Sequence, residues 1–150
     1  MPQSLINLHV HIIFSTRGRE PLIDQELASQ LYGYMGGVAR KVGSVVLAIG
    51  GMPDHVHLLA TLGRELWVAK LVREVKARSS RWVHETFPDR AAFGWQAGYG
   101  AFTVSASLVE RVKDYIARQE EHHRHRTFQD EYLAFLRRHG LTWDDRYVWD

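Results

Sequence analysis

Alternating apolar and polar positions predict two long strands. Every second residue from Leu8 to Phe14 is apolar, and the positions between them include His9 and His11. The same alternation recurs at residues 55–62. Because successive strand residues point to opposite faces, each segment would present one side to a core. Shorter apolar segments predict two further strands, at residues 45–49 and 99–105.

Apolar residues at helical spacing predict four helices, at about residues 24–43, 65–85, 107–125 and 129–139. Asp24 stands where a helix N-cap is expected, and Gly43 follows the last apolar position of the first helix. Ser107 and Glu110 have the spacing of a capping box, which predicts the start of the third helix.

The predicted order is strand, helix, strand, strand, helix, strand, followed by two more helices. This is the ferredoxin-like βαββαβ arrangement of the α+β class, an antiparallel sheet with two helices on one face. The histidines at positions 9, 11, 55 and 57 would then share the opposite, open face, which the helix at about residues 107–125 is available to cover. We therefore predict one domain over residues 1–150, with a C-terminal helix and tail at about residues 129–150.

Composition narrows the class of protein. The 150 residues include no cysteine, which excludes a disulfide framework, a thiolate zinc site and a cysteine nucleophile. No apolar stretch is long enough to cross a bilayer and no signal-peptide pattern is present, so we expect a cytoplasmic protein without a membrane partner. The formal net charge of +2 is too small to indicate nucleic-acid binding by itself.

The sequence His55-Val56-His57 carries the clearest candidate chemistry. Two strand residues separated by one position lie on the same face, about 6.5–7 Å apart, so their imidazoles can converge on one divalent ion. The alternative is a pair of histidines on a hydrated sheet surface. Tyr115 and Gln119 lie one helical turn apart and share a helix face, which suggests a nucleophile and a third metal ligand. Tyr115 alone would also fit a core position.

These residues resemble a known family. The segment Gly51–Leu59 is similar to the histidine-hydrophobe-histidine motif of HUH endonucleases. Residues 95–102, followed by residues 115–119, resemble the single-tyrosine transposase branch, which serves small bacterial insertion sequences and the related REP-associated tyrosine transposases. The similarity covers essentially the whole chain. It implies one nucleophile, Tyr115, and three metal ligands: His55, His57 and Gln119.

The implied activity is that of a metal-dependent single-strand DNA endonuclease and strand transferase. Such a transposase nicks and rejoins single-stranded DNA at hairpin-bearing element ends through a 5′-phosphotyrosine intermediate. Two imidazoles, an amide oxygen and substrate oxygens suit Mg²⁺ or Mn²⁺, with a slight preference for Mn²⁺. The resemblance also implies a homodimer in which Tyr115 acts in trans, and dimerisation would cover an exposed edge strand of the sheet.

Further histidines lie near the predicted site. His9 and His11 form a second histidine-x-histidine pair, but no tyrosine accompanies it, and His11 could support the metal site near His57. His122 and His123 follow Tyr115 by about two helical turns. His123 could support the same site, although a solvated helix end with a cationic histidine is the alternative.

Basic residues gather at positions 70–81 of the helix predicted at 65–85, where only Glu74 opposes them. We expect them to contact DNA phosphates, which position the nucleic acid without reading its sequence. The alternative is an ordinary solvated helix face. The predicted DNA-binding residues are Lys70, Arg73, Lys76, Arg78 and Arg81, with Arg17 and Arg19 after the first strand.

Three other classes of protein share parts of this pattern. A histidine-triad hydrolase would need a third histidine where Leu59 stands, and a two-histidine phosphodiesterase would need two separated His-x-Ser/Thr motifs. The stronger alternative is a non-catalytic binder of nucleic-acid hairpins on the same fold. Such a protein would retain DNA without forming a covalent adduct.

Overall fold

Four antiparallel strands form one sheet in the order β2-β3-β1-β4. The computed structural model describes residues 2–150. The strands are β1 (Leu8–Ser15), β2 (Ser44–Met52), β3 (His55–Leu62) and β4 (Gly100–Val104). With β1 and β3 as the central pair, the molecule has the predicted ferredoxin-like α+β arrangement.

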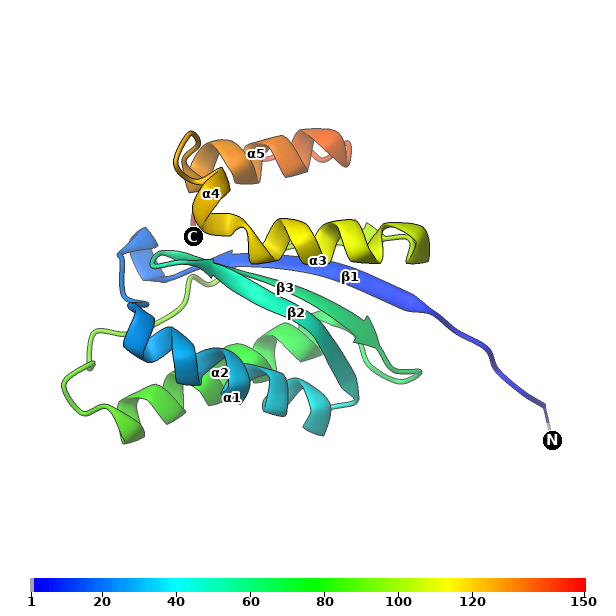
Figure 1. Cartoon of the computed structure of the whole chain (residues 1–150), viewed down its shortest axis with the longest axis horizontal. Coiled ribbons are helices and arrows are strands. Elements are labelled where there is room, and N and C mark those ends of the chain that lie inside the picture. Colours follow the sequence, from blue (N-terminus) through cyan, green and yellow to red (C-terminus); the bar gives the residue numbers. More distant parts are fainter. Residues whose placement is uncertain (1) are drawn as a thin grey trace.

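Two helices, α1 (Gln25–Lys41) and α2 (Val68–Thr86), cover one face of the sheet (Figure 1). Asp24 caps α1 as predicted, because its carboxylate accepts a hydrogen bond from the Leu27 N–H at 2.9 Å. Gly43 follows the helix with φ 97°, a left-handed conformation that favours glycine. α2 begins three residues later than predicted, because the Leu66 N–H bonds to the Gly63 carbonyl in a turn before it.

Both faces of the central strands are buried: the face that α1 and α2 leave open is covered by the helix predicted to be available for it and, beyond that prediction, by the C-terminal helix. Ile12 and Phe14 of β1 belong to the core under α1 and α2. Ile13, which points the other way, belongs to a second apolar cluster formed with residues of the C-terminal helix and β4: Phe102, Phe128, Tyr132, Phe135 and Leu136. The histidines of β1 and β3 therefore lie between the sheet and a second helical layer.

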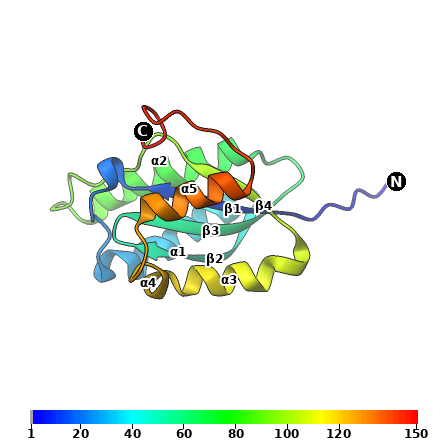
Figure 2. The ribbon, with the colours of Figure 1, turned by 90° about the horizontal axis from the view of Figure 1, so that it is seen from above.

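That second layer consists of α3 (Val109–Ala117), the short α4 (Gln119–His122) and α5 (Phe128–Arg138). Seen from above, α3 runs along β2 while α5 lies over the central strands (Figure 2). Close packing of α3 depends on Gly50 in β2, where a Cβ atom would come within 2.9 Å of the Ile116 carbonyl oxygen. The sheet thus fixes the position of the helix that carries Tyr115.

The single helix predicted at 107–125 is interrupted. A 3₁₀ turn, Ala106–Leu108, precedes α3, and no side chain caps the helix, since the Ser107 hydroxyl bonds to Ser105 instead. The helix breaks at Arg118, whose N–H bonds to the carbonyls of Asp114 and Tyr115. At this break the Gln119 side chain points into the interior, where it contacts His55 and Glu131.

The last helix and tail fold back over the sheet. Thr127 caps α5 by accepting a hydrogen bond from the Asp130 N–H at 3.1 Å. Trp149 packs against the α5 cluster, and the Asp150 backbone oxygen accepts a hydrogen bond from the Gly98 N–H at 2.8 Å. The C-terminal tail is therefore held to the rest of the molecule at its end. Over residues 2–150, no helix has the length and apolarity needed to cross a membrane.

Candidate active site

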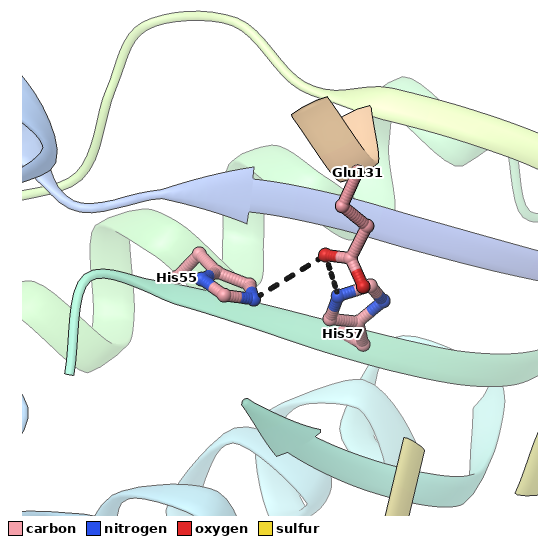
Figure 3. Close-up of side chains that lie close together, drawn as sticks. All are labelled: His55, His57 and Glu131. Carbon is pink, nitrogen blue, oxygen red and sulfur yellow. Dashed lines mark hydrogen bonds and ion pairs between the residues drawn. The ribbon is translucent and has the colours of Figure 1, made fainter. Parts of the chain in front are cut away.

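His55 and His57 lie on the same face of β3, and both side chains are fully buried. Their Nε2 atoms point toward one carboxylate oxygen of Glu131, at 3.5 Å from His55 and 3.0 Å from His57 (Figure 3). The shared face predicted from sequence is confirmed. The alternative of two histidines on a hydrated surface does not hold, because α5 covers them.

The other ring nitrogen of each histidine has its own partner. His55 Nδ1 lies 2.7 Å from the Asp54 carboxylate, and His57 Nδ1 lies 2.8 Å from His11 Nε2. Such contacts fix the orientation of the rings, so that both Nε2 atoms remain directed at the shared point. Burial, together with the nearby His57, lowers the pKa of His11 to about 3. At physiological pH His11 is therefore neutral, and its contact with Nδ1 helps to orient the His57 ring.

Glu131 of α5 is the centre of the cluster, and the sequence did not single it out. Only 1% of its surface is exposed, and its carboxylate accepts hydrogen bonds from Tyr115, Gln119 and His123 as well as from His57. Burial acts to raise the pKa of this carboxyl, but the hydrogen bonds from His123 and His57 outweigh burial and hold the pKa well below its ordinary value. Glu131 is thus a buried anion.

A signal for Glu131 is present in the sequence. The apolar face of α5 carries Phe128, Tyr132 and Phe135 at helical spacing, and Glu131 falls on the same face. A carboxylate on the apolar face of a helix requires a buried partner. From the sequence alone, Glu131 could not be distinguished from an ordinary acidic residue in the first turn of a helix.

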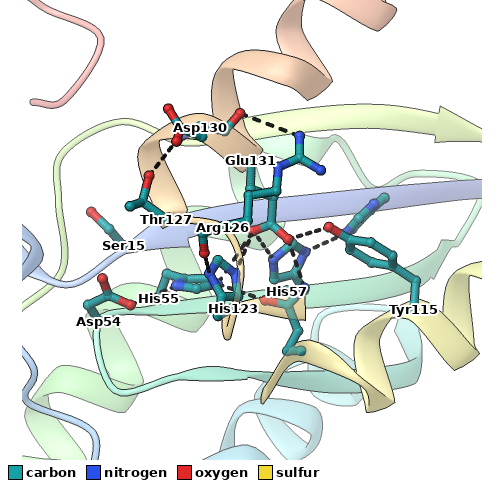
Figure 4. Close-up of polar contacts among 12 residues, drawn as sticks. Ser15, Asp54, His55, His57, Tyr115, His123, Arg126, Thr127, Asp130 and Glu131 are labelled. Carbon is teal, nitrogen blue, oxygen red and sulfur yellow. Dashed lines mark hydrogen bonds and ion pairs between the residues drawn. The ribbon is translucent and has the colours of Figure 1, made fainter. Parts of the chain in front are cut away.

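Tyr115 and Gln119 both reach this cluster despite the break between α3 and α4 (Figure 4). The Tyr115 hydroxyl donates to Glu131, while the Gln119 carbonyl oxygen lies 2.8 Å from His55 Nε2. Burial, reinforced by the Glu131 carboxylate, raises the pKa of Tyr115 well above its ordinary value. The phenol is therefore held protonated at neutral pH.

The donor set fits a divalent cation. One ligand atom from each of His55, His57 and Glu131 lies within 4.8 Å of the others. Two imidazole nitrogens and a carboxylate suit Mn²⁺ and similar metals, whereas Mg²⁺ prefers oxygen ligands. A cation at this point would also offset the buried negative charge of Glu131. Gln119, the third ligand inferred from the resemblance, presents its carbonyl oxygen to the same cluster.

Comparison with known proteins decides the family. A family model described as "Transposase IS200 like" matches residues 4–119. The chain belongs to this family. The match includes His55, His57, Tyr115 and Gln119, and it ends before α5 and Glu131. The transposase is thus built from a family core and a C-terminal segment that lies beyond the match.

Individual relatives agree with this assignment. The transposase is 27% identical over 119 residues to the ISDra2 transposase TnpA of Deinococcus radiodurans, covering 76% of this chain and 85% of that protein. A crystal structure of a candidate transposase from the same organism matches with a TM-score of 0.63 and 26% identity, over 79% of this chain and 98% of the other. The fold also resembles a REP-associated tyrosine transposase bound to a REP hairpin, with a TM-score of 0.61 and 17% identity, over 82% of this chain and 73% of that one.

Most of the basic residues predicted to bind DNA lie on exposed positions away from the histidine cluster. Lys70, Arg73, Arg78 and Arg81 are exposed on α2, on the opposite face of the sheet (Figure 1). Arg17 is exposed after β1, whereas Arg19 is half-buried. The structure therefore separates a basic helix from the candidate active site.

Lys76 differs from the other predicted DNA-binding residues. Its Nζ donates hydrogen bonds to the carbonyl oxygens of residues 96, 97 and 98, at 2.9, 3.3 and 2.5 Å. Burial lowers the pKa of this amine to about 8. Lys76 fastens the loop before β4 to α2, and its three donors are occupied within the protein, which corrects the expectation of a phosphate contact.

Proposed function

We propose that this transposase nicks and rejoins single-stranded DNA at hairpin-bearing element ends through a 5′-phosphotyrosine formed on Tyr115. One observation carries the proposal: the Tyr115 hydroxyl, two histidine Nε2 atoms and the Gln119 amide all meet at the Glu131 carboxylate. A nucleophile and a cation-binding donor set thus occupy one buried cluster. We assign the metal ligands to His55, His57, Gln119 and Glu131.

The reaction is an in-line displacement at phosphorus. The phenolic oxygen of Tyr115 forms a bond to phosphorus as its proton passes to water, and the bond from phosphorus to the 3′ oxygen breaks. The 3′ oxygen leaves with the bonding pair and takes a proton from water. Attack by a 3′-hydroxyl on the phosphotyrosine reverses these steps and rejoins strands without ATP. A bound Mg²⁺ or Mn²⁺ would polarise the phosphate and stabilise the leaving oxygen.

The residues around the reacting groups have distinct tasks. Asp54 and His11 hold the two imidazoles in orientation through their Nδ1 atoms. Glu131 holds the Tyr115 hydroxyl at the cluster. Both metal-site histidines are fully buried with α5 in the position seen here.

DNA is held in part by the exposed basic residues. Arg17, Lys70, Arg73, Arg78 and Arg81 would contact phosphates of the hairpin on the far face of the sheet. A structural relative was solved with a REP hairpin, which supports a hairpin as the class of ligand. These contacts predict an affinity that falls steeply with salt.

We further propose that the transposase works as a homodimer with Tyr115 acting in trans. Within a single chain, Tyr115 already reaches its own histidines, so the cluster can also form in cis. Exchange of the segment after the connection Ser105–Leu108 would give the same contacts with the partner's sheet. The length and flexibility of that connection determine whether the segment packs on its own sheet or on the partner's sheet.

Covalent capture of DNA tests the function. Labelled single strands carrying the element end are incubated with Mg²⁺ or Mn²⁺ and resolved on a denaturing gel. We expect an adduct with the native transposase, and a loss of about a thousandfold or more in Tyr115→Phe, because no phenol remains to attack. Tyr147→Phe, which alters an exposed tail residue, is the matched control. Binding without any adduct in the native protein would favour a non-catalytic hairpin binder instead.

A further inference from the structure

A groove of about 750 Å³ opens beside the histidine cluster. The connection between α4 and α5 forms one wall, and the turn between β2 and β3 forms another. Its charged and polar lining includes Arg19, Asp54, His123, Arg124, Arg126 and Asp130. Arg124 and Arg126 are exposed, and among residues 2–150 neither takes part in an ion pair. The groove is within the volume range of pockets that hold ligands.

Neighbouring side chains orient two charged residues of the groove, Asp54 and Arg19. The Asp54 carboxylate is paired with His55 Nδ1 at 2.7 Å. The Arg19 guanidinium lies 5.1 Å from the centre of the Trp149 ring, which orients it. Arg19 also has φ 58°, a backbone conformation that costs energy in a non-glycine residue and is typical of functional sites.

His123 separates the groove from the reacting groups. Its Nε2 lies 3.2 Å from Glu131, its Nδ1 lies 2.7 Å from the Arg126 carbonyl, and its ring centre lies 4.7 Å from that of His55. The groove therefore meets the cluster at the His55 end. Figure 4 shows Tyr115 approaching Glu131 from the opposite side, from α3.

The position of the groove relative to Tyr115 indicates which part of the cleaved DNA the groove can hold. In an in-line displacement, the attacking and leaving oxygens lie on opposite sides of phosphorus. With Tyr115 on one side of the cluster, the strand that ends in the leaving 3′ oxygen must depart on the His55 side. That is the side on which the groove opens, with Arg124 and Arg126 at its wall.

We propose that this groove binds the single-stranded DNA segment on the leaving, 3′-hydroxyl side of the cleaved phosphate. Arg19, Arg124 and Arg126 contact the backbone phosphates of that segment. The subsite rests on the proposed function, and its α4–α5 wall lies beyond the family match, which ends at residue 119. Retention of this segment keeps the 3′-hydroxyl near the phosphotyrosine, ready for rejoining.

Binding measurements test the subsite. In a Tyr115→Phe background, which prevents cleavage, the probes are hairpin oligonucleotides from the DNA flanking the gene, with or without a leaving-side extension of about eight nucleotides. Arg124→Ala/Arg126→Ala should weaken binding of the extended probe about tenfold and reduce its log–log salt slope by about 1.4, or 0.7 for each lost contact. Binding of the probe without the extension should not change.

The control variant is Arg40→Ala/Arg111→Ala, which removes two exposed arginines outside the groove. Equal weakening with both probes, or no weakening with either, would overturn the subsite. A photoreactive 5-iododeoxyuridine on the leaving side should crosslink to residues 123–130. Crosslinks confined to α2 or α3 would contradict the proposal.

The two proposals fail in different ways. If the native transposase forms no adduct, the proposed function fails whatever the groove binds. If it forms the adduct and the double arginine variant keeps full affinity for the extended probe, only the subsite fails.

Discussion

The Tyr115 hydroxyl donates a hydrogen bond to the Glu131 carboxylate and thereby joins α3 to α5. Tyr115 lies inside the family match, whereas Glu131 lies beyond it. Burial and this contact together keep the phenol protonated, because both loss of solvation and a buried anion oppose the formation of a phenolate. Activation of the tyrosine therefore requires that this negative charge be neutralised or moved.

Removing the Glu131 charge should lower both the pKa of Tyr115 and the affinity of the site for Mn²⁺. In Glu131→Gln, we expect the pKa of Tyr115 to fall toward its ordinary value, because a neutral amide no longer disfavours the phenolate. Affinity for Mn²⁺ should fall by about tenfold or more, since an anionic oxygen ligand is lost. Tyrosine absorbance titrated against a Tyr115→Phe reference measures the first effect, and calorimetry measures the second. Glu120→Gln, at an exposed position, is the control, and unchanged Mn²⁺ affinity in Glu131→Gln would exclude Glu131 as a ligand.

Loss of a metal-site histidine should remove both cation binding and cleavage. His57→Ala also leaves the buried Glu131 carboxylate without one of its donors, so we expect the free energy of unfolding to fall by about 1–3 kcal/mol. Calorimetry with Mn²⁺ and urea unfolding measure the two effects separately. His9→Ala, which removes a histidine bonded to Thr61, should retain cation affinity. Normal Mn²⁺ affinity in His57→Ala would show that His57 is not a ligand.

Stability should decline as the pH is lowered from about 6.5 toward 3, in part through His11. The pKa of His11 is about 3 in the folded chain, against an ordinary value of 6.5 in the unfolded chain, so over this range the unfolded chain binds the proton and the folded chain does not. Unfolding is therefore favoured as the pH falls through that window. His11→Gln should show a shallower dependence in urea unfolding between about pH 7 and pH 4.5, since one of the linked protons is removed. His125→Gln, at an exposed position, should behave as the native chain, and an unchanged slope in His11→Gln would contradict the assignment.

Subunit mixing tests the trans arrangement. A heterodimer of His57→Ala with Tyr115→Phe contains one composite site with both groups intact if Tyr115 acts in trans, and none if it acts in cis. We expect the mixture to regain adduct formation that neither variant has alone. A mixture that stays inactive although sedimentation shows a dimer would assign the tyrosine to its own chain, and a monomer at working concentration would refute the dimer.

The sequence by itself determined the features that depend on neighbouring residues. Alternation located β1 and β3, and Asp24 located the start of α1, because strand and helix periodicity and capping are local properties. The same reasoning put His55 and His57 on one face. The order of strands and helices then gave the ferredoxin-like arrangement, since few topologies accommodate that order.

Only the tertiary structure decided the features that join distant segments. Glu131 meets His57 across 74 residues, Lys76 donates its hydrogen bonds to a loop about twenty residues away, and the break at Arg118 accompanies the burial of Gln119. No local pattern encodes such contacts, because each depends on where a second element packs. The covering of the histidine face by α5 is the clearest case: its apolar side was visible in the sequence, but the surface it would bury was not.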